Sequence, residues 1–116
     1  MRRLVQAAFW AALLLAFTCA ILPADSAPQL VPWDKAEHFI AFYVLAVLGA
    51  VAYPASALVL LGASLSAFGA LIEVVQAIPA LHRDSDFWDW VADTLAIAAA
   101  LLPVVLIRVR KWMAAA

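Results

Sequence analysis

The residues that could do chemistry gather between Glu73 and Asp93, in the stretch EVVQAIPALHRDSDFWDWVAD. This stretch holds most of the acidic residues of the chain, together with His82 and Arg83, and it lies between two long apolar runs. Ionisable side chains next to hydrocarbon are costly to keep, so they mark binding, conduction or polar helix contacts. Carboxylates, an imidazole and a guanidinium could bind an anionic group, carry a proton or act as acid and base.

The composition of the chain is that of a membrane protein. Of its 116 residues, 69% are hydrophobic and 13% are charged, whereas a soluble domain has roughly 45–50% apolar and about 25% charged residues. We therefore expect residues 1–116 to form a single transmembrane domain. The only cysteine, Cys19, lies in an apolar run and excludes an internal disulfide.

Prolines divide the apolar sequence into segments that are each about long enough to cross a hydrocarbon core of roughly 30 Å. The predicted fold class is an all-α membrane protein with four transmembrane helices in an antiparallel bundle. We predict helices at about residues 4–22, 34–53, 55–78 and 86–107. The arginines before the first segment raise the alternative of a cleaved signal peptide, but the segment is long for one, so we favour a retained anchor.

The charges separate along the chain. Between the two basic ends, the eight acids with Lys35 and Arg83 give −6, whereas the ends themselves carry +5 and no acid. The positive-inside rule then predicts cytoplasmic termini and external loops at 23–33 and 80–87. We interpret this separation as a signal of topology rather than of nucleic-acid binding, so we expect no nucleic-acid partner. The basic residues of the ends are Arg2, Arg3, Arg108, Arg110 and Lys111.

Three of the predicted helices carry a stripe of polar and small residues spaced three and four apart, which places each stripe on one face. Small residues on such a face let another helix approach closely, so the polar residues beside them turn inward rather than toward lipid. The stripes are Asp34, His38, Ala41, Leu45 and Gly49; Gly62, Ser66, Gly69, Glu73 and Gln76; and Asp86, Asp89, Asp93, Ala96 and Ala100.

The depth of the polar residues in their helices also agrees. Counted from the helix ends at 1.5 Å per residue, five of them reach one level in the outer leaflet. We predict that they converge there, and that Glu73 and Asp93 are close enough to disfavour double ionisation. The five residues are His38, Glu73, Gln76, Asp89 and Asp93.

Plainer interpretations exist for several of these residues. Glu73 could form a structural ion pair with Arg83 or His38 that only holds helices together. Trp88 and Trp90 are typical of the aromatic belt at a membrane interface. Asp93, about two turns inside a membrane helix, is the residue least easily explained in this way. The loop side chains are expected to be solvated surface groups: His82, Asp84 and Asp86.

The order of the polar residues resembles the VanZ-like family of small bacterial membrane proteins. Asp34-Lys35 followed by His38-Phe39 resembles the DKxxHF entry to a helix in that family. A second motif of the family, the series E..Q…R…D…N, is matched between Glu73 and Asp93. With both motifs, the resemblance covers about residues 33–100. The residues that match this series are Glu73, Gln76, Arg83, Asp89 and Asp93.

The sequence departs from the family at three positions. The family usually has Asn where Asp93 stands, Gly where Ala96 stands, and often Gly where His82 precedes the arginine. The resemblance implies a multi-pass protein of the bacterial cytoplasmic (inner) membrane. It also implies an association with the cell envelope, because the named member is linked to resistance to the glycopeptide teicoplanin.

Three functions remain open at this stage. The favoured one is an envelope protein whose external polar cluster binds a lipid head group, a lipid-linked cell-wall precursor or a partner protein, and modulates glycopeptide susceptibility. The alternatives are a membrane enzyme acting on a lipid-linked phosphate, and a proton or ion conduit, for which four helices would require a homo-oligomer. We predict no cofactor and no metal, because no strict metal-ligand spacing is present. The candidate site residues are Asp34, Lys35, His38, Glu73, Gln76, Arg83, Asp89 and Asp93.

Overall fold

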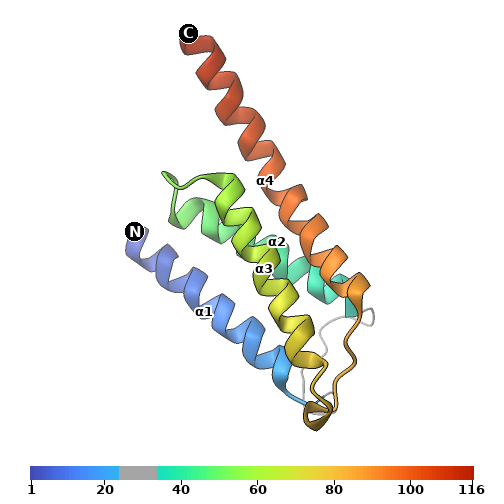
Figure 1. Cartoon of the computed structure of the whole chain (residues 1–116). Helices are drawn as coiled ribbons and strands as arrows, with labels where there is room; N and C mark the ends of the chain where they lie inside the picture. The colour runs from blue at the N-terminus through green and yellow to red at the C-terminus, as the bar shows by residue number, and fades with distance from the viewer. Residues whose placement is uncertain (24–33) are drawn as a thin grey trace.

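The computed structural model of the chain describes residues 1–23 and 34–116, and for Asp34 it describes the backbone alone. The described residues form a bundle of four α-helices whose sequence neighbours run antiparallel (Figure 1). Each α-helix is long and apolar enough to cross a membrane. The predicted all-α fold of four membrane-spanning helices is therefore confirmed. The elements are α1 (Arg2–Ile21), α2 (Asp34–Ala52), α3 (Leu58–Gln76), the 3-10 helix η1 (Pro79–Leu81) and α4 (Phe87–Ala115).

Two helix ends differ from the sequence prediction by three residues or more, and the others by one or two at most. Helix α3 begins at Leu58 rather than at 55, because Ser56 turns the chain: its amide and its hydroxyl both donate to the Tyr53 carbonyl, at 3.0 and 2.7 Å. Helix α4 continues to Ala115 instead of ending at 107. The last residues, RVRKWMAAA, contain neither proline nor glycine and mostly favour helix, so nothing stops α4 there.

The core of the bundle lies where α2 packs against α1 and α4, with α3 closing the side between them. The largest fully buried apolar side chains, Phe42 and Leu45, belong to α2, whereas the outer faces of all four α-helices expose large apolar side chains. An exposed apolar surface of this kind fits contact with lipid rather than with water. The core includes Phe9, Phe42, Leu45, Ala46, Leu65, Ile72, Ala96 and Ile97.

The small-residue stripe of α3 faces α4, as the spacing predicted. A Cβ atom placed on Gly69 would lie 2.8 Å from Asp93 Oδ2, so the two helices are too close here for any larger residue without a shift. One turn away, Ser66 Oγ and Thr94 Oγ1 share a hydrogen bond of 2.9 Å, and Trp90 Nε1 donates to the Ser66 carbonyl at 3.0 Å. Polar side chains thus line the contact between α3 and α4 below Gly69 as well, and they hydrogen-bond across it.

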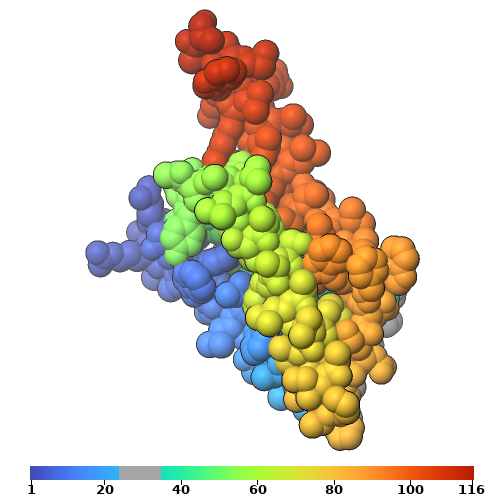
Figure 2. Space-filling view, in the orientation of Figure 1, coloured from blue at the N-terminus to red at the C-terminus, as the bar shows by residue number. Residues whose placement is uncertain are grey.

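The two ends of the bundle differ in charge. Both chain termini and the turn between α2 and α3 lie toward one end, and η1 with its flanking loop lies at the other (Figure 1). Arg108 holds the first end together, donating to the carbonyls of Pro54 at 2.8 Å and Ser56 at 3.2 Å. The last turns of α4 project beyond the other helices (Figure 2). Its 29 residues measure about 43 Å, more than a hydrocarbon core, so the basic end reaches past the membrane interior.

Candidate functional site

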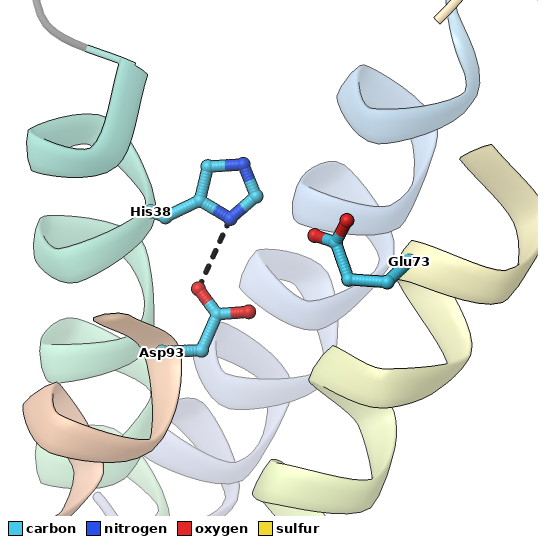
Figure 3. Close-up of side chains that lie close together, drawn as sticks. All are labelled: His38, Glu73 and Asp93. Carbon is cyan, nitrogen blue, oxygen red and sulfur yellow. Dashed lines mark hydrogen bonds and ion pairs between the residues drawn. The ribbon is translucent and has the colours of Figure 1, made fainter. Parts of the chain in front are cut away.

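Three helices bring an imidazole and two carboxylates together at the end of the bundle that carries η1. His38 of α2, Glu73 of α3 and Asp93 of α4 each offer a nitrogen or oxygen atom, and these atoms lie within 4.8 Å of one another. His38 Nδ1 is 3.0 Å from Asp93 Oδ1, and the carboxyl group of Glu73 points toward this pair (Figure 3). The predicted proximity of Glu73 and Asp93 is confirmed.

The position of each residue in its helix explains the meeting. His38 lies about one turn after the start of α2, Glu73 about one turn before the end of α3, and Asp93 almost two turns into α4. Because neighbouring helices are antiparallel, these offsets bring all three to a similar depth. Gly69 contributes by lacking a Cβ atom, which leaves room for the Asp93 carboxylate.

Lys35 connects this trio to the first turn of α4. Its ammonium group lies 2.8 Å from Asp86 Oδ2 and 3.3 Å from Asp89 Oδ1. Asp89 Oδ2 in turn lies 3.8 Å from His38 Nε2, so His38 stands between the carboxylates of Asp89 and Asp93. We call Lys35, His38, Glu73, Asp86, Asp89 and Asp93 the acid–histidine cluster.

Asp86 is not the freely solvated charge that its loop position suggested. It is the N-cap of α4, where Oδ1 accepts a hydrogen bond of 2.9 Å from the Trp88 amide. The hydrogen bond from Lys35, followed by that from the Trp88 amide, lowers the pKa of Asp86 from its ordinary value. An aspartate just before a helix is a known capping signal, and the same geometry aims its second oxygen at Lys35.

Glu73 holds the loop before α4 against α3. Its Oε2 accepts a hydrogen bond of 3.0 Å from the Asp86 amide, while Ser85 Oγ donates to the Glu73 carbonyl at 2.8 Å and lies 3.4 Å from Oε2. Its other oxygen, Oε1, is buried and has no hydrogen-bond partner among the described residues. The Glu73 side chain is therefore anchored on one oxygen and leaves the other facing inward.

Gln76 and Arg83, both predicted to belong to the site, contact the end of α1 instead. Gln76 Nε2 donates to the Ala20 carbonyl at 3.0 Å, and Arg83 Nη1 donates to the Leu22 carbonyl at 3.2 Å. Arg83 makes no ion pair with a described carboxylate, so the Glu73–Arg83 ion pair that the sequence allowed is not formed. The Asp34 side chain lies outside the described residues.

The acid–histidine cluster holds more acid than base. Four carboxylates face one ammonium group and one imidazole, and Asp89 and Asp93 are 3% and 0% exposed. A buried excess of negative charge attracts protons or cations and repels anions. The cluster is therefore suited to holding a proton or a cation, whereas Arg83, which lies outside it, is suited to an anionic group.

The chain matches no protein-family model, no curated protein and no solved structure in the three comparisons made with known proteins.

Proposed function

We propose that this chain is a VanZ-like, multi-pass protein of the bacterial cytoplasmic membrane that binds the phosphate group of a lipid at its external polar end. The lipid is either a membrane phospholipid or a lipid-linked cell-wall precursor, because both present a phosphate at the membrane surface. The four apolar helices and the basic end of the bundle support the membrane placement and its orientation. The motifs around His38 and Arg83 support the family assignment.

The observation that carries the proposal is that the Arg83 guanidinium pairs with no carboxylate of the described residues. Between residues 4 and 107 the chain has only two basic residues of the lysine or arginine type, Lys35 and Arg83. Lys35 is taken by Asp86 and Asp89, whereas Arg83 donates one hydrogen bond to a backbone carbonyl and pairs with no described carboxylate. A guanidinium group has five N–H donors in a planar fork that matches phosphate, so Arg83 keeps donors for such a ligand.

An apolar groove between α2 and α4 supports lipid contact near the polar end of the bundle, although Arg83 is not among the residues that line it. Lys35 lies at its polar end, and the remaining lining is almost wholly apolar, including Phe39, Ile40, Trp88 and Leu95. A hydrocarbon chain fits such a groove on the face of a bundle, since it loses nothing by leaving the surrounding lipid. The groove thus offers a place for an acyl or prenyl chain at the external leaflet.

Binding of a cell-wall precursor would connect this site to glycopeptides. A precursor held at the membrane surface is less accessible to a large external antibiotic, which is the direction of effect that the VanZ-like resemblance implies for teicoplanin. Expression of the chain in a susceptible bacterium should raise the inhibitory concentration of teicoplanin, and the Arg83→Ala variant should raise it less.

Native mass spectrometry of the purified protein tests the proposal. The wild-type protein should retain a phosphate-bearing lipid, Arg83→Ala should lose it, and Arg83→Lys should lose nearly as much because lysine lacks the bidentate fork. Arg110→Ala is the matched control, since Arg110 is an exposed arginine at the opposite end. The adduct mass separates a phospholipid from a cell-wall precursor. Equal lipid retention by Arg83→Ala and the wild type would refute the proposal.

A second candidate function, a membrane enzyme acting on a lipid-linked phosphate, is favoured by the His38–Asp93 contact. A buried carboxylate hydrogen-bonded to an imidazole orients the ring and stabilises its protonated form, as an acid–base catalyst requires. Release of inorganic phosphate from a prenyl diphosphate by the wild type, abolished in His38→Gln, would support this function over simple binding. Lipid retention without phosphate release would support binding alone.

A further inference from the structure

We infer that His38, Glu73 and Asp93 form a binding site for one divalent transition-metal ion. This site goes beyond the proposed lipid binding, because it rests on the interior of the acid–histidine cluster and not on Arg83. The sequence carries no metal-ligand motif, because the three residues come from three different helices and are far apart along the chain.

The distances suit a small ion after a modest movement of side chains. The three residues each offer a ligand atom within 4.8 Å of the others, and His38 Nδ1 lies 3.0 Å from Asp93 Oδ1. Two ligands of a tetrahedral ion with bonds of about 2.1 Å lie about 3.4 Å apart. The remaining pairs therefore need to close by up to about 1.4 Å, which side-chain torsions can supply without moving the helices.

The Glu73 side chain gives independent evidence for a ligand at this position. It is only 8% exposed, and its Oε1 is buried without a hydrogen-bond partner among the described residues. Figure 3 shows its carboxyl group directed toward His38 and Asp93. A buried carboxylate oxygen without a donor carries the full cost of its lost hydration, and a bound cation would remove that cost.

Groups around the trio are placed as the outer shell of a metal site. The second ring nitrogen of His38 faces Asp89 Oδ2 at 3.8 Å, so a metal on Nδ1 would leave Nε2–H directed at a carboxylate, the usual arrangement for a ligating histidine. Glu73 Oε2 is held by the Asp86 amide at 3.0 Å, which fixes the carboxylate plane. Lys35 pairs with Asp86 and Asp89, so its ammonium group offsets the negative charge of these two carboxylates, which do not belong to the proposed ligand set.

The donor set decides the class of ion. One imidazole nitrogen and two carboxylate oxygens suit zinc, manganese, iron or cobalt, whereas magnesium and calcium prefer sites made of oxygen alone. A divalent ion would also neutralise the Glu73 and Asp93 carboxylates inside the bundle. Three protein ligands leave at least one coordination position for water or another small ligand.

Zinc titration of the purified protein tests the inference. The protein is prepared in detergent without a histidine tag, stripped with a chelator, and titrated with zinc against a fluorescent competitor. The ligand variants His38→Gln, Glu73→Gln and Asp93→Asn keep side-chain size. The controls His82→Gln and Asp84→Asn remove an exposed histidine and an exposed acid at the same end of the bundle.

The wild type and both controls should bind one zinc ion per chain at about 10 µM free zinc, and each ligand variant should bind at least about tenfold more weakly. Equal binding by wild type and His38→Gln, or no stoichiometric binding by the wild type, would overturn the inference. X-ray absorption of the zinc-loaded wild type needs no variant, so it decides the matter even if a variant fails to fold. A shell of one imidazole with oxygen ligands supports the site, and a sulfur ligand or several imidazoles would overturn it.

Discussion

Replacing Gly69 with alanine should destabilise the bundle, although alanine is the better helix former. The added Cβ would lie 2.8 Å from Asp93 Oδ2, and Asp93 is wholly buried, so its carboxylate must shift. Overpacking of this kind costs about 1–3 kcal/mol, while alanine in place of glycine gains about 1 kcal/mol of helix propensity. The net effect should be a loss of about 0–2 kcal/mol in the free energy of unfolding.

Gly62 of the same helix provides the matched control. A Cβ there would meet Leu101 at 3.4 Å and Ile97 at 3.5 Å, which are ordinary contact distances. Gly62→Ala should therefore show the propensity gain alone and become more stable by up to about 1 kcal/mol. The difference between the two variants, about 1–3 kcal/mol, measures the overpacking at Gly69 directly. The assay is reversible unfolding in detergent titrated with sodium dodecyl sulfate.

A second substitution at Asp93 separates crowding from charge. Asp93→Ala removes the carboxylate that the new Cβ would meet, so in that background Gly69→Ala should behave like Gly62→Ala. Asp93→Asn keeps the volume of the side chain and should leave the penalty in place. Equal stability of Gly69→Ala and Gly62→Ala in the otherwise wild-type protein would refute the close α3–α4 packing on which the site depends.

Three further predictions concern the polar end. Glu73→Gln should lower the free energy of unfolding by about 0.5–1.5 kcal/mol, because the hydrogen bond from the Asp86 amide to the Glu73 carboxylate becomes a bond to a neutral amide oxygen. Asp93→Asn should change it by less, and the reverse order would contradict the arrangement around Glu73. The pKa of Asp86 is lowered on folding, so the stability that its carboxylate provides is present above its ordinary pKa and is lost as the pH falls through the lower pKa of the folded state. Asp86→Asn keeps the helix cap but should lack this part of the acid destabilisation in melting curves below about pH 4. Identical melting curves for the two proteins would argue against the Lys35 pairing. His82 has a left-handed backbone with φ 51°, which glycine adopts more easily than a residue with a Cβ atom. His82→Gly should therefore raise the free energy of unfolding by about 0.5 kcal/mol, whereas His82→Ala should not. Equal effects of the two substitutions would show that the backbone at His82 is unstrained.

The helices and the meeting of their polar faces could be predicted from the sequence because both follow from spacing. Proline positions and apolar length indicate the spans, and residues three and four apart share a face whatever the bundle does elsewhere. Antiparallel neighbours with matching depths then place His38, Glu73 and Asp93 together, and the structure brings these three within reach of one another.

The contacts of Gln76 and Arg83 could not be predicted in the same way. Both donate to carbonyl groups at the end of α1, and the place of α1 beside α3 is set by apolar packing that leaves no distinctive sequence pattern. The pairing of Asp86 could not be predicted for another reason: an acid in a loop is usually solvated, and only the position of Lys35 in the structure shows that Asp86 has a partner. Helix α4 continues past residue 107 because no proline or glycine follows to end it. The end of a helix is harder to predict from the absence of such a residue than from its presence.

The central claim, that the acid–histidine cluster lies at the external end of a four-span protein, is tested most directly by cysteine accessibility in intact cells. In a Cys19→Ala background, Ala80→Cys in the exposed η1 segment should react with a membrane-impermeant maleimide. Ala115→Cys, beside the basic cluster at the end of α4, should react only after the cells are permeabilised. Labelling of Ala115→Cys in intact cells with protection of Ala80→Cys would place the cluster on the cytoplasmic side and contradict the account.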